Sequence, residues 1–111
     1  MGSLYHGWNS APLKMPDRVL AHLKVLIATK LRRGESFTIT WEHAEQQVPG
    51  RTSIWLQPSI PLRFVFDSRE PEELDSRWMQ ELARAANNGA ITLSASQLRP
   101  FEVIVEVLSG D

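Results

Sequence analysis

The chain contains no cysteine, and no apolar run approaches the roughly 20 residues needed to span a membrane. Without cysteine it forms no disulfide bond, has no thiolate nucleophile and offers no cysteine-ligated zinc or iron–sulfur site. The first residues, MGSLYHGW, lack the basic start and apolar centre of a signal peptide. These absences predict a cytoplasmic protein without a membrane partner.

Signatures of catalysis are also missing. No serine lies in a Gly-x-Ser-x-Gly turn, and no glycine-rich loop is present to cradle a phosphate. The histidines His6, His22 and His43 follow no metal-ligand spacing. Acid–base neighbours such as Glu42 and His43 occur in every soluble protein, so they carry little weight. The sequence therefore predicts a non-catalytic protein with no metal and no cofactor.

The composition is that of an ordinary folded domain. Of the 111 residues, 42% are hydrophobic and 23% charged, and four tryptophans and four phenylalanines supply large core side chains. This length suits one hydrophobic core, so we expect a single domain over residues 1–111. The net charge of −1 divides unevenly: residues 1–55 carry seven basic and four acidic side chains, and residues 56–111 carry five and nine. Such polarity suits head-to-tail contacts or a modest basic face, although an unevenly charged solvated surface is the simpler interpretation.

A capped amphipathic helix is predicted from Asp17 to Arg33. Asp17 stands where an N-cap residue belongs, and Gly34 is a natural residue to end the helix. The apolar residues that repeat at helical spacing and define the buried face are Val19, Leu20, Leu23, Leu26, Ile27 and Leu31.

Alternating apolar residues predict the strands. Residues 36–41, 52–57 and 62–67 follow one another with short connections, which predicts an antiparallel meander. Residues 3–6 and 13–15 are expected to form a hairpin ahead of the first helix.

Asp75 can cap a second helix that runs to about Asn87, where Asn-Asn-Gly ends it. Residues 91–93 and 101–107 are the last predicted strands, and the final one is an edge available to a second molecule. The predicted fold class is therefore α+β, with two helices packed on a mainly antiparallel sheet in the order ββ-α-βββ-α-ββ.

Three segments carry a resemblance to a known family: DRVLAHLKVLIATKLRRGESFTITW, GRTSIWLQPSIPLRFVFD and LDSRWMQELARAAN. Together with the opening MGSLYHG, they resemble a small, functionally uncharacterised family of actinobacterial proteins of about one hundred residues. The resemblance covers roughly residues 1–93. Members of that family are often labelled "ATP-dependent DNA ligase", so the resemblance implies a link to that label.

The ligase label conflicts with the residues present. An ATP-dependent ligase forms a lysyl-adenylate on the lysine of a Lys-x-Asp-Gly motif. The three lysines here, Lys14, Lys24 and Lys30, are followed by Met-Pro-Asp, Val-Leu-Ile and Leu-Arg-Arg. A nucleotidyltransferase pocket with a nucleic-acid clamp also exceeds what one small core can supply. We therefore expect no ligase catalysis from this chain alone.

A cluster of basic residues is the candidate nucleic-acid site. If the fold gathers them, the cations could contact phosphates and Trp55 could stack on a base. The simpler interpretation is that the last cations of the helix stabilise its dipole and the others solubilise strands. The candidate residues are Lys30, Arg32, Arg33, Arg51, Arg63 and Trp55.

A second set of residues is the candidate protein interface. Ala21, Val25 and Ala28 make the far side of the first helix unusually apolar, so we expect a sheet to cover one side and a partner the other. Trp55 alternates against its apolar neighbours, so it either faces outward as an interface anchor or is covered by a helix on the second face of the sheet. Ile104 gives the last strand a less polar outer face.

The function predicted from these observations is a small, non-catalytic, cytoplasmic binding or assembly module that forms a homodimer. The dimer would form through the first helix, Trp55 or the terminal strand. The alternative is a nucleic-acid-associated protein, DNA-binding or accessory to a ligase, that uses the modest basic cluster.

Overall fold

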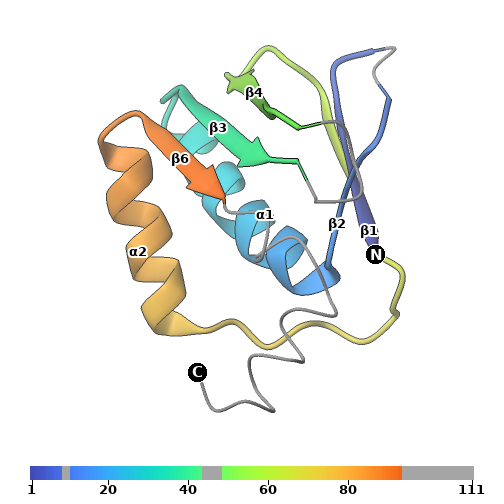
Figure 1. Ribbon diagram of the computed structural model, residues 1–111. Coiled ribbons are helices and arrows are strands. Elements are labelled where there is room, and N and C mark those ends of the chain that lie inside the picture. Colours follow the sequence, from blue (N-terminus) through green and yellow to red (C-terminus); the bar gives the residue numbers. More distant parts are fainter. Residues whose placement is uncertain (9–10, 44–48, 94–111) are drawn as a thin grey trace.

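The computed structural model describes residues 1–8, 11–43 and 49–93 (Figure 1). In chain order, the elements are β1 (Gly2–His6), β2 (Leu13–Met15), α1 (Asp17–Arg32), β3 (Phe37–Glu42), β4 (Arg51–Leu56), β5 (Leu62–Val65), α2 (Ser76–Asn87) and β6 (Ala90–Leu93). This confirms the α+β class and the order ββ-α-βββ-α-β as far as the described residues reach. The strand predicted at 101–107 lies outside them.

The six strands of the described residues form two three-stranded sheets. Sheet A has the order β2-β1-β5 and is antiparallel throughout. Sheet B has the order β4-β3-β6, with β3 antiparallel to β4 and parallel to β6. The predicted meander is therefore wrong in its last step, because β5 pairs with β1 and not with β4.

The reason is that alternation shows which face of a strand is buried but not which strand lies beside it. Between β4 and β5 the chain turns at residues 57–60, where the Ile60 N–H donates to the Gln57 carbonyl at 3.2 Å. The Pro61 carbonyl then accepts a hydrogen bond from the Gly7 N–H at 3.0 Å, which extends the pairing of β5 with β1.

One hydrophobic core joins both sheets to both helices, and α1 passes behind sheet B in Figure 1. Burial of each large aliphatic side chain contributes about 1.5–3 kcal/mol, so α1, with five core residues, is the main organiser of the fold. Trp41 and Trp78 are partly buried and pack against this core. The buried hydrophobic residues are Leu4, Met15, Val19, Leu20, Leu23, Leu26, Ile27, Phe37, Ile39, Leu56, Leu82, Ala86, Ile91 and Leu93.

The two ends of α1 differ in how far the sequence predicted them. Gly34 has a φ of +74°, and its N–H and that of Glu35 donate to the carbonyls of Leu31 and Lys30, which is a Schellman ending. The start differs, because Pro16 occupies the N-cap position and Asp17 is already helical. The Asp17 carboxylate instead accepts hydrogen bonds from the chain that follows β5.

Two polar clusters fasten α1 to α2, one at each end of the helix pair. At the C-terminal end, the Lys30 ammonium donates to Glu35 Oε2 at 2.6 Å and to Asn87 Oδ1 at 3.2 Å. The hydrogen bond from Lys30 is the main cause that lowers the pKa of Glu35. At the N-terminal end, His22 contacts Asp75 and Trp78. The two helices therefore run side by side in the same direction.

Candidate binding groove

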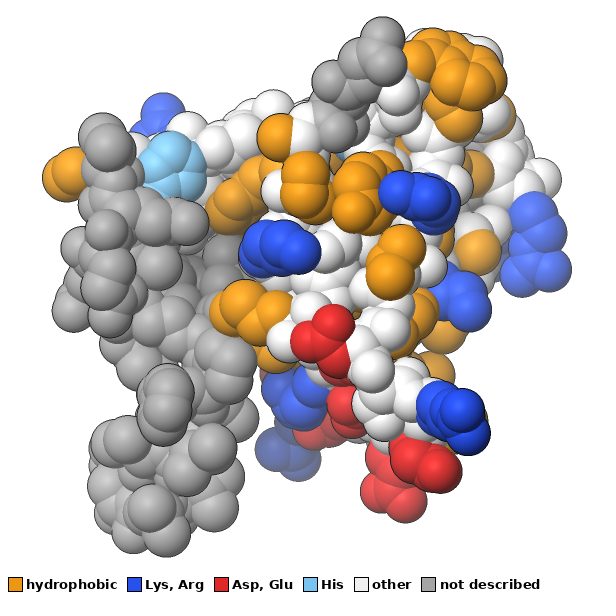
Figure 2. All heavy atoms as spheres, turned by 90° about the vertical axis from the view of Figure 1, so that its right-hand side faces the viewer, with side chains coloured by type: hydrophobic (Ala, Val, Ile, Leu, Met, Phe, Trp, Pro, Cys, Tyr) orange, Lys and Arg blue, Asp and Glu red, His pale blue; other side chains and the backbone are white. Residues whose placement is uncertain are grey.

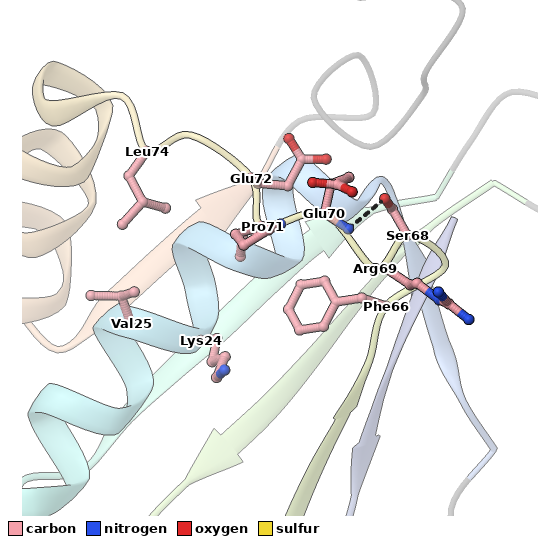
Figure 3. A pocket seen from close by; sticks show the side chains of 10 residues that line it. Lys24, Val25, Phe66, Ser68, Arg69, Glu70, Pro71, Glu72 and Leu74 are labelled. Atoms are coloured by element: carbon pink, nitrogen blue, oxygen red, sulfur yellow. Dashed lines mark hydrogen bonds between the residues drawn. The ribbon is translucent and has the colours of Figure 1, made fainter.

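An open groove lies between α1 and the β5–α2 loop, residues 66–75, and has a volume of about 380 Å³ (Figure 3). Volumes of this order are typical of ligand sites, which makes the groove the candidate functional site of the described residues. Its lining residues are Ala21, Lys24 and Val25 from α1, and Phe66, Ser68, Arg69, Glu70, Pro71, Glu72 and Leu74 from the loop.

The groove has an apolar centre and a charged rim. Val25 and Leu74 approach each other from the helix and the loop at one end, and both are large apolar side chains that remain 40% and 45% exposed (Figure 3). Toward the other end the Lys24 ammonium lies 5.8 Å from the centre of the Phe66 ring, a cation–π contact. Figure 2 shows acidic side chains gathered at the lower end of the adjoining face, near Lys and Arg side chains.

The loop that forms one wall is fastened to α1 at both of its ends. The Asp17 carboxylate accepts hydrogen bonds from the N–H groups of Asp67 and Ser68 at 3.1 Å. Five residues further along α1, the Nε2 atom of His22 accepts a hydrogen bond from the Asp75 N–H at 2.8 Å. Because both anchors come from one rigid helix, the groove is held open before any ligand arrives.

His22 has a defined tautomer in this arrangement. Its Nδ1 atom lies 2.6 Å from the Arg18 carbonyl oxygen, which can only accept, so Nδ1 carries the hydrogen. The Asp75 N–H can only donate, so Nε2 is unprotonated. The imidazole is fully buried, and its ring contacts that of Trp78 at 4.4 Å between centroids. His22 is thus a structural link between α1 and the start of α2.

The chemistry of the lining suits binding. The hydrogen bond between lining residues runs from the Glu70 N–H to the Ser68 hydroxyl at 3.0 Å and shapes the loop (Figure 3). Within the described residues, no three histidine, aspartate or glutamate side chains are arranged to hold a metal ion. The groove can therefore accept an apolar side chain and surround it with charges of both signs.

The predicted interface residues fall into three places. Ala21 and Val25 line the groove, and Ala28 is exposed further along the same face of α1. Trp55 is 52% exposed on the outer face of sheet B, and no helix of the described residues covers it. The outward alternative holds for Trp55, while Ile104 lies beyond the part of the chain that the structure describes.

The predicted basic residues are dispersed. The Lys30 side chain is only 5% exposed and is committed to Glu35 and Asn87, because it lies at helical spacing from the buried Leu26. Arg32 is exposed at the end of α1, and the Arg33 guanidinium lies 3.7 Å from Glu35.

The strand arginines lie elsewhere. Arg51 pairs in register with Glu42, whereas Leu56 pairs with Phe37, the first residue of β3 after α1. Arg51 is therefore about 16 Å along the sheet from the end at which α1 leads into β3. The Arg63 guanidinium stacks on Tyr5 at 4.2 Å on sheet A.

Two buried polar residues, His22 and Lys30, are structural anchors that were not predicted from the sequence. A signal was present: with Val19 and Leu26, they complete the helical spacing of a buried face. His43 follows β3, and its Nε2 lies 2.7 Å from the Thr52 hydroxyl. The loop residues of the groove carried no signal, because their position depends on the contacts with α1.

The fold and the groove together define a small α+β protein with a helix–loop groove as its candidate site. Residues 1–96 match the family described as "Domain of unknown function (DUF7882)", and the chain belongs to that family. The resemblance to a small uncharacterised family is confirmed at this level. No curated protein and no solved structure matches the chain. Neither of the two described helices is both long and apolar enough to cross a membrane.

Lowering the pH should weaken the contact between α1 and the N-terminal end of α2, because it protonates the carboxylate of Asp75. Its carboxylate caps α2 by accepting from the Trp78 N–H at 3.1 Å, and this hydrogen bond is the main cause that lowers the pKa of Asp75. A lowered carboxyl pKa gives stability that is present above the unfolded value and lost as pH falls through the folded one. We expect Asp75→Asn, which keeps a capping side chain, to lose less stability than the wild type between about pH 6 and pH 3. Thermal unfolding across this range measures it, and parallel acid profiles would contradict it.

Proposed function

We propose that this protein is a non-catalytic binding module of the cytoplasm that receives an apolar segment of a protein partner in the α1–loop groove. The observation that carries the proposal is the preformed groove, in which the exposed Val25 and Leu74 lie between charged side chains. Large apolar side chains left exposed within a charged rim are typical of protein interaction sites. The absence of cysteine supports the cytoplasmic assignment.

Binding at the groove should depend on Val25. An aspartate at this position places a charge on the apolar floor, so Val25→Asp should weaken the binding of the dye anilinonaphthalene sulfonate by about tenfold or more. The matched control is Val65→Asp, since Val65 is 42% exposed on sheet A and does not line the groove. Fluorescence titration at nanomolar protein concentration, where copies of the chain do not cover the groove, measures both. Equal dye binding by the two variants would contradict the proposed site.

The alternative function, nucleic-acid binding, has weaker support than binding at the groove. Arg32 and Arg33 are exposed together at the end of α1, but Lys30 is buried and Arg51 and Arg63 lie on different sheets. The nucleic-acid hypothesis predicts salt-sensitive DNA binding that is lost on replacing Arg32 and Arg33. Binding unchanged in that double variant would remove the alternative.

A further inference from the structure

We propose that the groove is covered by a second copy of this chain, with the two α1 helices packed antiparallel across a two-fold axis at Val25. This inference rests on the proposed binding function and names its partner. The pairing buries Val25 and Leu74 of both copies, the two groove side chains that remain large, apolar and exposed. Ala21 and Ala28 lie one turn on either side of Val25, and their small side chains let a second helix approach closely.

The exposed charges around the groove are complementary between α1 and the loop. The outward side of α1 is basic, and the β5–α2 loop is acidic apart from Arg69. Among the described residues, the four ion pairs include none that engages Lys24, Arg32, Glu72 or Glu73. The exposed basic residues of α1 and the Arg33 that follows it are Arg18, Lys24, Arg32 and Arg33, and the exposed acidic residues of the loop are Asp67, Glu70, Glu72, Glu73 and Asp75. Of these, Arg18, Arg33, Asp67 and Asp75 already form ion pairs within the chain. Lys24 and Arg32 on the helix and Glu70, Glu72 and Glu73 on the loop are left for a partner.

An antiparallel arrangement brings these charges together. The loop is anchored at Asp17 and His22, so it flanks the N-terminal half of α1. Arg32 lies seven residues beyond Val25, about 10 Å along the helix, on the C-terminal half. Rotation about an axis at Val25 therefore carries Arg32 of one copy to the N-terminal half of the other.

At that position Arg32 lies opposite the partner's Arg18, which is seven residues before Val25, and beside the partner's acidic loop with Glu72 and Glu73. Two-fold symmetry makes the contact twice, which is how an isologous interface becomes self-complementary. A parallel arrangement would bring Arg32 against Arg32 at the end of α1 away from the acidic loop. In the antiparallel arrangement the partner's Arg18 is already paired with a loop carboxylate, Asp75, and the other loop carboxylates lie beside Arg32, so the charges favour the antiparallel one.

The outer face of sheet B is the competing interface. Trp55 projects from the side of the sheet opposite the core, whereas the groove lies on the outward side of α1. A single two-fold interface uses one of these surfaces. Within the described part of sheet B, the register places the uncharged Thr38 beside Trp55, so no matching of acidic and basic segments supports that surface. Substitutions on each surface therefore distinguish the two candidate interfaces.

Sedimentation velocity on the full chain with charge-reversal variants tests the proposal. We expect a dimer at micromolar concentrations, with Arg32→Glu and the pair Glu72→Arg, Glu73→Arg each raising the dissociation constant by about tenfold or more. Combining all three reversals in one chain restores opposite charges across the axis, so dimer affinity should return to within about threefold of the wild type. Trp55→Ala should leave the dimer unchanged. Arg84→Glu is the matched control, because it reverses a charge in the last turn of α2.

The outcomes separate this proposal from the proposed function. A wild-type monomer at about 100 µM, with dye binding still lost in Val25→Asp, would overturn the second copy as partner and leave the groove as a binding site. A dimer that Trp55→Ala dissociates, or that the combined reversals do not restore, would also overturn it. Circular dichroism confirms that each variant is folded.

Discussion

Gly2→Ala should lower the free energy of unfolding by about 1–3 kcal/mol, although alanine ordinarily stabilises a strand relative to glycine. Gly2 is buried in β1, where an added Cβ would lie 2.6 Å from Leu20 Cδ2, 2.7 Å from Asp17 Oδ1 and 2.8 Å from the Val65 carbonyl oxygen. The last of these is backbone of the neighbouring strand, so it cannot turn aside. The methyl group therefore displaces the start of α1 from sheet A.

The same displacement reaches the groove, because Asp17 holds Asp67 and Ser68 of the loop. We expect the variant to lose dye binding at the groove as well as stability, measured by fluorescence titration and urea unfolding. Gly34→Ala is the comparison: a Cβ there meets nothing within 4 Å, and only its φ of +74° opposes the change. Its cost should be about 1 kcal/mol with groove binding intact. A Gly2→Ala protein as stable as the wild type would show that the close approach does not exist.

His22→Leu should cost about 2–3 kcal/mol of folding free energy. Leucine fills a similar space but removes the hydrogen bond to the Arg18 carbonyl and leaves the Asp75 N–H without its acceptor. The loss frees the C-terminal end of the β5–α2 loop and separates α1 from the start of α2. Urea unfolding measures the stability, and hydrogen exchange of the Asp75 amide reports the local opening.

His22→Gln separates the hydrogen bond from the packing. Glutamine carries a side-chain oxygen at about the reach of Nε2, so it can accept from the Asp75 N–H and should retain about half of the lost stability. Equal destabilisation by His22→Leu and His22→Gln would assign the role of His22 to ring packing against Trp78 instead.

Local chemistry predicted the elements but not their partners. The helix from Asp17, the Gly34 stop, the Asp75 cap and β3 could be predicted because each depends on neighbours in the sequence. The pairing of β5 with β1 and of β6 with β3 could not, since strand periodicity fixes a face and leaves the neighbour open.

The candidate site could likewise be predicted only where it depends on neighbours in the sequence. The apolar far side of α1 at Ala21 and Val25 was visible in the helical spacing, and these residues do line the groove. The opposite wall could not be predicted, because Leu74 is placed there by backbone N–H groups far along the chain that donate hydrogen bonds to the side chains of Asp17 and His22. Asp17 was predicted as a cap for its own helix, and the N-cap position of Pro16 frees its carboxylate for the loop.

Site-specific cross-linking at Val25 tests the central claim most directly, because the chain contains no cysteine of its own. If α1 packs on α1 of a second copy across an axis at this residue, the two Cα atoms lie within the roughly 7 Å that a disulfide requires. Val25→Cys should then form a covalent dimer under mild oxidation much faster than Gln80→Cys, a control on the exposed side of α2. Equal rates for the two variants would contradict a second copy at the groove.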